Sequence, residues 1–578
     1  MVLAFEPKRM RYVALACDYD GTLAQDGVVS ERTAAALRAL RDSGRRLILV
    51  SGRELEDLLS VFDGIELFDA AVLENGGLLY RPADRSTQVL TEPPSERLVE
   101  LLRKRGVEPL SIGRAIIATW EPHQTAVLEA IHELGLEMQV IFNKGAVMVL
   151  PSGVNKGTGL ARALDELGLS AHNVVGIGDA ENDHAFLAAC ECAAAVANAL
   201  PTVKERADIV TEGARGDGVA ELIGQLLDDD LASVAPRLGR HEIVIGTRAQ
   251  AQAVCMAPYG ERVLVAGPSG SGKSKTVTAL VERLGAAGYQ FCLVDPEGDY
   301  EGFENSVRLG DASHAPTMDE IMAVLNQPRQ TAIVNLLGLA LEDRPAFFAN
   351  LVPRLSEMRS QTARPHWLVV DEAHHMLPIE RDPSALGLPR DFQGLMLVTV
   401  HIDRLAPSVL EPLTTAIAVG DDPGGTLAAV AKAVGERAPA KTPAHLGKGQ
   451  VAVWRRKWEK PVKVELEPAT ADHRRHVRKY ATGELADDEC FYFRGPKGKL
   501  NLKAQNLVLF AQLAQGVDDA TWEYHLRQHD YSQWFERAIK DRKLASAAAR
   551  VERNKKLSPR ASRERIVQTI QERYTLPA

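Results

Sequence analysis

The stretch that most constrains this chain is CDYDGTLA at residues 17–24, directly after an apolar run at residues 12–16. Such a run is typical of a short buried strand, and Gly21 lets the chain turn sharply where the strand ends. Two carboxylates, Asp18 and Asp20, stand one residue apart at that turn. Alternate side chains of a straight strand point to opposite faces, so both carboxylates serve one site only if the backbone turns here.

A carboxylate pair of this kind suits phosphoryl transfer, because one carboxylate can attack phosphorus while the other moves the proton of the leaving group. A hard divalent cation must neutralise such a cluster, and oxygen ligands favour Mg²⁺. Short D-x-D-G strings also occur as turns that cap a helix, and these residues alone leave that alternative open.

Three further motifs follow in order along the chain. The run RRLILVSGR is a second predicted strand that ends near Ser51, whose hydroxyl is placed to hydrogen-bond a phosphoryl oxygen. Lys156 lies in VNKG before a predicted helix and offers a fixed positive charge. A third predicted strand, at residues 174–177, runs into GDAEND, which supplies Asp179 and Asp183 as further metal ligands.

The order D-x-D-G-T, S-G-R, N-K-G and G-D-x-x-N-D resembles the haloacid dehalogenase superfamily over roughly residues 10–225. The similar branch has a large cap and includes sugar-phosphate and phosphoglycolate phosphatases. The resemblance implies a Mg²⁺-dependent phosphomonoester hydrolase in which Asp18 is the nucleophile and Asp20 the general acid/base. Asn75 in ENGG also matches a loop of this branch. The catalytic residues implied are Asp18, Asp20, Ser51 and Lys156, and the metal ligands implied are Asp18, Asp20, Asp179 and Asp183.

Residues 10–80 alternate between strand and helix patterns, including a predicted helix at residues 30–43 that Gly44 ends. This alternation predicts a parallel, doubly wound sheet with its active site at the carboxyl ends of the strands.

From residue 81 to 151 the pattern changes to strand pieces near 115–120 and 138–142 and helices at 95–105 and 122–134. An insertion at this point predicts a cap that covers the phosphoryl site and chooses the leaving group. The residues that could select a substrate there are more simply interpreted as solvated surface residues: Arg114, Glu121, His123, Asn143 and Lys144.

A second domain is predicted to begin after an acidic linker that contains Pro and Gly. A predicted strand at residues 261–266 leads into GPSGSGKS and then a helix at 276–284, which is G-x-x-x-x-G-K-S in its strand–loop–helix context. The glycines let backbone N–H groups curl around a phosphate, and Lys273 reaches the outer phosphates. Ser274 can ligate Mg²⁺. The predicted ATP-binding residues are Gly267, Gly270, Ser271, Gly272, Lys273, Ser274 and Asp371.

The apolar run at residues 366–370 supplies the other half of such a site, because it ends in Asp371 and Glu372. Asp371 suits the Mg²⁺ shell, and Glu372 suits activation of the attacking water. Thr399 or His401, at the end of another predicted strand, is placed to sense the terminal phosphate.

Together with DPEGDY at residues 295–300, these motifs resemble the HerA/FtsK-type branch of P-loop ATPases over roughly residues 240–460. The resemblance implies an oligomeric DNA translocase. The chain departs from this branch in two ways: the N-terminal barrel is reduced to little more than residues 241–247, and the arginine finger has only Arg404 and Arg437 as candidates.

The whole chain, at 578 residues, is too long for one core, and its net charge of −9 argues against a protein that coats nucleic acid along its length. It has no apolar run of about 20 residues that could span a bilayer, and its N-terminus lacks the pattern of a signal peptide. Six scattered cysteines are interpreted as reduced core thiols. We therefore expect a cytoplasmic protein without a membrane partner.

Residues 471–578 reverse the charge balance, with 21 Lys and Arg against 14 Asp and Glu, and hold 11 of the 31 aromatic residues. Basic grooves with stacking rings bind single-stranded nucleic acid, and the basic runs at 473–480 and 491–499 fit such a groove. The favoured alternative is a small helical core with solvated charges, because Leu507, Phe510 and Leu513 have helical spacing. The module resembles a C-terminal family without an assigned function.

The predicted fold is therefore multidomain α/β. It comprises a Rossmann-like haloacid dehalogenase core at residues 1–80 and 152–230, an α/β cap at 81–151, a P-loop α/β domain at 240–465 and a basic, mainly helical module at 470–578. The predicted function is a Mg²⁺-dependent phosphatase fused to an ATP-hydrolysing HerA-like domain, with a phosphorylated small molecule or nucleic-acid end as substrate. DNA and further copies of the chain are its predicted partners.

Two alternatives remain open. One is a bifunctional polynucleotide kinase/phosphatase, against which Glu372 argues because a water-activating carboxylate would waste ATP. The other is a metabolite phosphatase whose P-loop domain serves as a nucleotide-gated scaffold.

Overall fold

The computed structural model of the protein describes residues 10–143, 145–233, 239–300, 303, 305–379, 388–389, 392–467, 469, 485, 490–496, 498, 500–539 and 541–574. The candidate selector Lys144 and the basic run at residues 473–480 lie outside these residues. The chain divides into two compact units, one of residues 1–294, 303–334 and 338–470, the other of residues 295–302, 335–337 and 471–578. Among the described residues, no helix has the length and apolar character needed to cross a membrane.

An eight-stranded sheet organises the first part of the chain, in the order β12-β11-β10-β1-β2-β3-β4-β5. Strands β12 to β3 are parallel, whereas β4 and β5 are antiparallel to their neighbours. The parallel, doubly wound arrangement predicted from the sequence is present. The strands are β1 (Ala14–Asp18), β2 (Arg46–Val50), β3 (Ala70–Leu73), β4 (Leu78–Arg81), β5 (Ser86–Val89), β10 (Val174–Gly178), β11 (Cys192–Ala195) and β12 (Ile209–Val210).

The first helix beside this sheet begins and ends where the sequence signals place it. For α1 (Glu31–Asp42), the Ser30 side chain accepts a hydrogen bond from the Thr33 backbone N–H, and Gly44 follows with a φ of +89°. The apolar residues of the strands and helices form one buried core that includes Leu37, Leu40 and Val175. The other helices are α2 (Leu55–Val61), α5 (Lys156–Leu167), α6 (His184–Ala189), α7 (Pro201–Arg206) and α8 (Gly216–Asp229), with short 3₁₀ turns η1 (Asp63–Leu67), η2 (Glu74–Gly76), η3 (Ala171–Asn173) and η4 (Glu181–Asp183).

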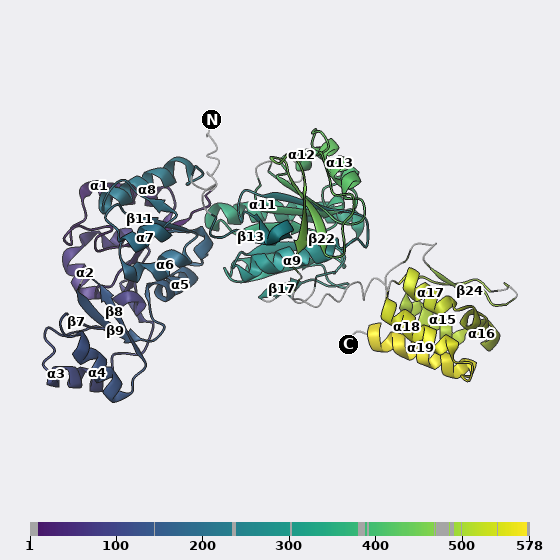
Figure 1. Cartoon of the computed structure of the whole chain (residues 1–578), viewed down its shortest axis with the longest axis horizontal. Helices are drawn as coiled ribbons and strands as arrows, with labels where there is room; N and C mark the ends of the chain where they lie inside the picture. The colour runs from purple at the N-terminus through teal and green to yellow at the C-terminus, as the bar shows by residue number, and fades with distance from the viewer. Residues whose placement is uncertain are drawn as a thin grey trace. The chain divides into compact units, whose positions relative to one another are not determined.

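The inserted segment forms a separate antiparallel sheet in the order β6-β7-β9-β8, with α3 (Glu96–Lys104) and α4 (Gln124–Leu134) packed on one face. Figure 1 shows β8 and β9 between these two helices and the elements of the eight-stranded sheet. The strands are β6 (Ser111–Ile112), β7 (Ile117–Trp120), β8 (Met138–Asn143) and β9 (Ala146–Pro151).

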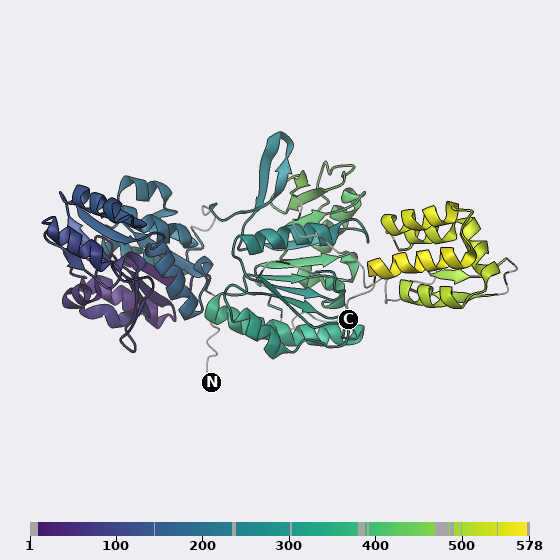
Figure 2. The same cartoon turned by 90° about the horizontal axis from the view of Figure 1, so that it is seen from below.

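A second sheet has eleven strands in the order β14-β13-β23-β22-β21-β15-β20-β19-β16-β18-β17. Strand β20 lies between β15 and β19 and is parallel to both. Figure 2 shows helices on both faces of this sheet. The strands are β13 (Ile243–Arg248), β14 (Gln252–Met256), β15 (Arg262–Ala266), β16 (Phe291–Asp295), β17 (Ser306–Leu309), β18 (Thr331–Asn335), β19 (Trp367–Val370), β20 (Leu395–Thr399), β21 (Thr415–Ala418), β22 (Gln450–Arg455) and β23 (Val462–Leu466).

Around this sheet, α9 (Lys273–Ala286) directly follows the glycine-rich loop. The segment at residues 241–247, which the sequence marks as a reduced barrel, leads into β13 from residue 243 on. This strand pairs with β14 and β23 as an antiparallel extension of the sheet. The remaining helices are α10 (Met318–Leu325), α11 (Arg344–Thr362), α12 (Pro407–Leu410) and α13 (Pro423–Ala433), with the turns η6 (Ala249–Ala251), η7 (Leu341–Asp343), η8 (Ala373–His375) and η9 (Ile402–Arg404).

The C-terminal module, yellow in Figure 1, consists mainly of helices. Most of its described aromatic side chains, including Phe491, Phe510 and Trp522, are buried in one core, so these rings are not available to stack on bases. The elements are β24 (Phe491–Phe493), β25 (Leu502–Ala504), α15 (Leu507–Gly516), α16 (Asp519–Gln528), α17 (Asp530–Arg537), α18 (Arg542–Arg553) and α19 (Pro559–Tyr574).

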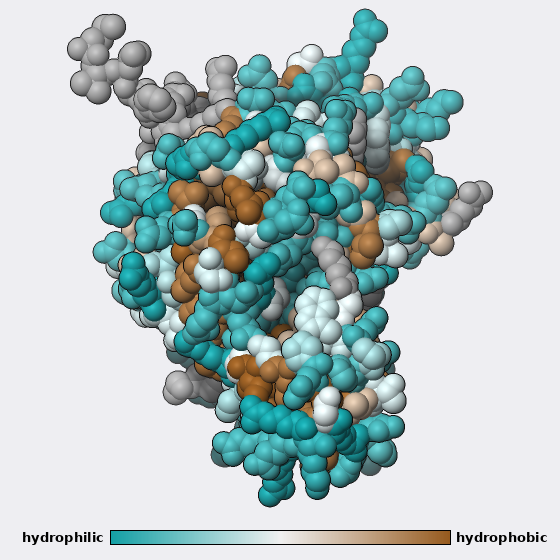
Figure 3. All heavy atoms as spheres, turned by 90° about the vertical axis from the view of Figure 1, so that its left-hand side faces the viewer, coloured by the Kyte–Doolittle hydropathy of each residue, from teal (hydrophilic) through white to brown (hydrophobic). Residues whose placement is uncertain are grey.

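The surface in Figure 3 is mostly hydrophilic, with apolar side chains in patches between the polar ones. Exposed apolar residues around the eight-stranded sheet include Val28, Leu59 and Val61. Exposed apolar side chains are common on folded proteins and by themselves indicate no partner. All six cysteines are free thiols, and all but Cys255 are buried.

Candidate active site

Three carboxylates meet at the carboxyl ends of the adjacent parallel strands β1 and β10. Asp18 is the last residue of β1, Asp179 follows β10, and Asp183 ends η4. Their oxygens lie within 4.8 Å of one another, and all three residues are buried. The sequence predicted this grouping from strand ends, because neighbouring parallel strands bring their carboxyl ends to one edge of the sheet.

Lys156, the first residue of α5, lies between two of these carboxylates. Its Nζ is 2.6 Å from Asp18 Oδ1 and 2.6 Å from Asp183 Oδ1, and the residue is only 2% exposed. Burial alone would lower the pKa of Lys156, but the two carboxylates more than offset it and raise that pKa. Burial, followed by the charge of Asp183, raises the pKa of Asp18 to about 7 against the opposing effect of Lys156.

The net charge of the site and its donor atoms decide whether it fits Mg²⁺. Three carboxylates and one ammonium leave a net charge of about −2 in a buried site, which a divalent cation would cancel. The donor atoms are carboxylate oxygens, the ligands that Mg²⁺ prefers. Asp18, Asp179 and Asp183 therefore fit the ion.

Asp20 differs from the prediction that its carboxylate joins the metal ligands. The turn after Asp18 directs it to Arg53, whose Nε and Nη2 lie 2.7 and 2.8 Å from its two oxygens. Arg53 also binds Asp57 at 2.7 Å. Asp20 is not a member of the buried carboxylate group, and its side chain is 42% exposed. A bidentate guanidinium occupies both of its oxygens, so the Asp20 carboxylate is not directed at a metal ion in this arrangement.

Ser51 follows β2 at the same edge of the sheet, because Val50 pairs with Asp18. The residue is 1% exposed, and its Oγ accepts a hydrogen bond of 3.2 Å from the Arg53 backbone N–H. Its predicted role in phosphoryl binding stays a prediction.

Asn75 connects three parts of the site. Its backbone N–H donates to Ser51 O at 3.1 Å, its Oδ1 accepts from Asn182 Nδ2 at 2.9 Å, and its Nδ2 lies 2.9 Å from Met148 Sδ. Met148 belongs to the cap strand β9, so the ENGG loop joins the second motif, the fourth motif and the cap. By itself, the N-G dipeptide in the sequence indicates only a turn.

Glu74 was not identified from the sequence, yet it fixes the cap to the core. Its carboxylate accepts backbone hydrogen bonds from Arg114, Ala115 and Ile116 at 3.1, 2.7 and 3.1 Å. Burial raises the pKa of Glu74, although these three donors oppose the rise. Nothing in the sequence around an N-G turn distinguishes such a buried carboxylate from an exposed one.

Gly76 permits the close approach of the ENGG loop to the VNKG motif. A Cβ on Gly76 would lie 2.0 Å from Asn155 O, and its φ is +103°. Asn155 caps α5 by accepting from the Gly157 and Thr158 backbone N–H groups. Gly76 therefore helps to position Lys156, the first residue of α5.

Of the candidate selectors, which the sequence favours as surface residues, Arg114 binds Glu56 and Thr87, and His123 Nε2 is 2.8 Å from Glu108 O. Asn143 lies on β8 and pairs with Ala146 of β9. The first two are thus surface residues with local partners.

The second predicted set lies at the carboxyl ends of β15, β19 and β20. Gly270 and Gly272 have φ values of +78° and +109°, and a Cβ on Gly267 would lie 2.1 Å from Val419 O. Lys273 Nζ lies 3.0 Å from Pro268 O within the loop. Ser271 lies in the glycine-rich loop, and Ser274 is the second residue of α9.

Asp371 and Glu372 follow β19, and the Glu372 backbone N–H donates to Asp371 Oδ1 at 2.8 Å. Thr399 Oγ1 is 3.1 Å from His374 Nδ1 and accepts from the His401 backbone N–H at 3.0 Å. Burial, followed by nearby cationic groups that include Arg404 and Lys273, lowers the pKa of His374 to about 4. His374 was not singled out in the sequence.

A family model described as haloacid dehalogenase-like hydrolase matches residues 15–115 and 124–223. Phosphoglycolate phosphatase 2 of Saccharolobus solfataricus is 30% identical over 221 residues, which are 37% of this chain and 92% of the relative. The chain belongs to the haloacid dehalogenase-like hydrolases. Phosphoglycolate phosphatase of Methanothermobacter thermautotrophicus is 30% identical over 37% of this hydrolase and 98% of the relative.

Among solved structures, a haloacid dehalogenase-like hydrolase from Bacteroides thetaiotaomicron is 21% identical, with a TM-score of 0.33 over 37% of this chain and 99% of that one. The hydrolase family carries phosphatase activity and uses Mg²⁺, and the carboxylate cluster is present. The family model and the two phosphoglycolate phosphatases support the predicted phosphatase core. They do not extend to the P-loop, so ATP binding, ATP hydrolysis and the likeness to HerA stay predictions.

Proposed function

We propose that this protein hydrolyses the phosphomonoester of a small metabolite through an aspartyl-phosphate on Asp18. The observation that carries the proposal is the buried group of Asp18, Asp179 and Asp183 with Lys156 between two of its members. A bound Mg²⁺ would supply charge neutralisation for the carboxylates and the phosphoryl oxygens.

In the first step, an Asp18 oxygen forms a bond to phosphorus while the bond from phosphorus to the leaving oxygen breaks. Asp20 supplies a proton to that oxygen. In the second step, water attacks phosphorus, Asp20 accepts its proton, and Asp18 is released. Lys156 and Ser51 hold phosphoryl oxygens during both steps. Arg53 must loosen its hold on Asp20 for the first step, because a carboxylate bound by guanidinium on both oxygens has no proton to give.

The cap face that meets the leaving group follows from the strand register. Met148 points to Asn75 of the core, and Ala146, two residues earlier on β9, shares that face. Ala146 pairs with Trp120 on β7 and with Asn143 on β8. An exposed indole and an amide thus lie on this face, which fits a small organic leaving group with a polar end.

The relatives named as phosphoglycolate phosphatases make 2-phosphoglycolate the first substrate to test. Phosphate release should be measured with Mg²⁺ on 2-phosphoglycolate, sugar phosphates, nucleoside monophosphates and phosphate-ended oligonucleotides. We expect turnover of at least one small metabolite and none by Asp18→Asn. Asn143→Ala should change KM for the preferred substrate more than His132→Ala, which alters the helical face of the cap. Turnover by Asp18→Asn equal to the wild type would refute the assignment.

A second activity, ATP hydrolysis by residues 240–465, is proposed from the second sheet. Its support is the glycine-rich loop after β15, Asp371 and Glu372 after β19, and Thr399 at the end of the intervening strand β20. Lys273 would bind the outer phosphates, Asp371 the Mg²⁺ shell, and Glu372 the attacking water. Thr399, held by His374, would report on the terminal phosphate.

ATP hydrolysis should be measured in the Asp18→Asn protein, so that the phosphatase site releases no phosphate, with Lys273→Ala added as the blank. Stimulation by DNA that falls with salt would support a HerA-like nucleic-acid motor. Phosphate transfer to hydroxyl-ended oligonucleotides would support the kinase alternative, and slow turnover with ATP-dependent assembly would support a nucleotide-gated scaffold. The same rate in both variants would refute ATP hydrolysis at this loop.

A further inference from the structure

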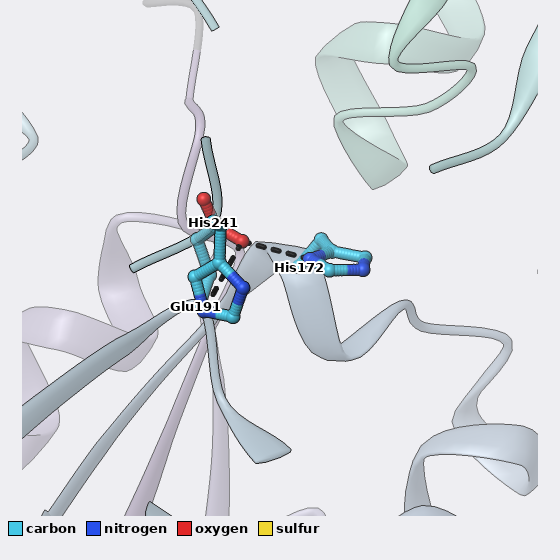
Figure 4. A group of neighbouring side chains, drawn as sticks. All are labelled: His172, Glu191 and His241. Carbon is cyan, nitrogen blue, oxygen red and sulfur yellow. Dashed lines mark hydrogen bonds and ion pairs between the residues drawn. The ribbon is translucent and has the colours of Figure 1, made fainter. Parts of the chain in front are cut away.

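Two histidines and a glutamate converge at the amino ends of β10 and β11, the opposite edge of the sheet from Asp179. His172 lies in η3 before β10, Glu191 directly precedes β11, and His241 lies just before β13 (Figure 4). Their ligand atoms lie within 4.8 Å of one another, and Glu191 is 1% exposed. Three segments far apart in the sequence therefore present two imidazoles and one carboxylate to a single point.

His172 presents a lone pair to the carboxylate when it is neutral. Its Nε2 is 2.7 Å from Ala287 O, and a carbonyl oxygen only accepts, so Nε2 carries the hydrogen. Nδ1 then has no hydrogen in the neutral ring, yet it lies 2.7 Å from Glu191 Oε2. Two lone pairs at this distance need a proton or a cation between them.

His241 has the same arrangement on the other side of Glu191. Its Nε2 is buried, has no hydrogen-bond partner among the described residues, and lies 3.9 Å from Glu191 Oε2. The ring also makes a hydrogen bond to the backbone of Cys190, and burial lowers the pKa of His241. A neutral His241 therefore also turns an unprotonated nitrogen toward the carboxylate.

We propose that His172 Nδ1, Glu191 Oε2 and His241 Nε2 bind a borderline divalent metal ion, with Zn²⁺ as the fitting species. Two imidazole nitrogens and one carboxylate oxygen are a ligand set that Zn²⁺ takes, with water in the fourth position. The second nitrogen of each ring is bound to backbone. Histidine ligands of metals are usually oriented in this way.

The distances require only small side-chain shifts. Ligand atoms around a tetrahedral Zn²⁺, with bonds of about 2.0–2.1 Å, lie about 3.3 Å apart. The separations from Glu191 Oε2 are 2.7 Å to His172 and 3.9 Å to His241, one shorter and one longer than this value.

Neighbouring groups hold the Glu191 carboxylate in place and limit the affinity of the site for a metal ion. Arg11 Nη2 is 2.7 Å from Glu191 Oε1, and the Tyr289 hydroxyl donates to Oε2 at 2.9 Å. In the metal-free protein, although burial opposes it, a proton shared with His172 and the charge of Arg11 lower the pKa of Glu191, so the carboxylate is ionised. The Arg11 charge repels a metal ion, but it contacts the oxygen that faces away from the two histidines.

The ion would act as a structural clasp. It would join the phosphatase sheet, through His172 and Glu191, to the segment that enters the second sheet at His241. Arg240, next to His241, already donates to Cys190 O at 2.7 Å and to Glu191 O at 3.1 Å. The site is separate from the carboxylates that bind Mg²⁺.

The test uses the full-length protein in saturating Mg²⁺, which occupies the phosphatase carboxylates. Zinc per chain is measured by elemental mass spectrometry after dialysis, and the zinc-dependent rise in melting temperature by calorimetry. We expect about one zinc per chain in the wild type and in the control His132→Gln. His241→Gln should lose at least ~100-fold in zinc affinity and show no zinc-dependent rise.

Glu191→Gln gives a second reading if His241→Gln folds poorly, because it keeps the side-chain shape and should also lose zinc. Four-coordinate absorption bands of bound Co²⁺, present in the wild type and absent in both variants, would support the same three ligands. Equal zinc binding by the wild type and His241→Gln would overturn the proposal. So would a wild type that binds no zinc, in which case His172 is an imidazolium paired with Glu191.

Discussion

Replacing Lys156 with methionine tests the charge balance of the phosphatase site directly. Methionine has a similar length but no charge, so the substitution removes the ammonium that lies 2.6 Å from both Asp18 and Asp183. Removing one partner of a buried ion pair costs about 3–5 kcal/mol, because the remaining charge is buried without compensation. The three carboxylates would then carry a net charge of about −3 without metal.

The metal-free Lys156→Met protein should therefore be destabilised by about 3–5 kcal/mol around β1 and α5. Mg²⁺ should recover most of this loss, since it returns two positive charges to the same oxygens. Phosphatase kcat should still fall by about 10²–10³ with Mg²⁺ present, because an electrostatic contact to the phosphoryl oxygens is gone.

Hydrogen exchange of the β1 and α5 amides, with and without Mg²⁺, measures the local stability without assuming that the whole chain unfolds in one step. Lys104→Met, on an exposed position of the cap helix α3, is the matched control and should change neither quantity. If Lys156→Met exchanges like the wild type without metal and keeps kcat within tenfold, the ammonium does not balance these carboxylates.

Three further outcomes follow from the same site. Because burial raises the pKa of Asp18 to about 7, the folded state binds more protons than the unfolded chain between about pH 4 and 7. The metal-free protein should lose stability as pH rises through that window, and Mg²⁺ affinity, followed by calorimetry, should rise and then level off above pH ~7. Gly76→Ala should lower the free energy of unfolding by about 1–3 kcal/mol more than Gly106→Ala. Both glycines have a positive φ, but only the new Cβ at position 76 would meet a backbone oxygen, at 2.0 Å. Equal losses in chemical denaturation would disprove the steric argument. Glu74→Gln should speed hydrogen exchange at residues 114–116, since an amide oxygen cannot accept all three N–H groups; unchanged exchange there would mean that Glu74 does not tether the cap.

The sequence predicted those features that depend on short stretches of chain. The strand before Asp18, the capped helix α1 and the gathering of Asp18, Asp179 and Asp183 follow from apolar runs and from the geometry of parallel strands. Each motif lies within about ten residues, and the pairing of parallel strands then brings the motif ends to one edge of the sheet.

The features that it missed depend on contacts between distant segments. Asp20 was assigned to the metal, but Arg53, 33 residues away, takes both of its oxygens. Glu74 looks like part of a turn until the start of the cap brings three donors to it. Side-chain partners of this kind are fixed by packing, which the spacing of residues along the chain does not encode.

Strand β10 connects the two metal-compatible sites of the phosphatase part, because His172 and Asp179 flank its two ends. Two steps of about 2 Å through the end of η3 and five steps of about 3.3 Å along β10 place these residues about 20 Å apart. At physiological salt, charges interact strongly only within about 8 Å, so zinc at one end would have little direct effect on the chemistry at the other. Loss of zinc should therefore lower the stability of β10 and leave kcat nearly unchanged in folded protein. A large fall in kcat with intact folding would instead show that the position of Asp179 depends on the clasp at the far end of its strand.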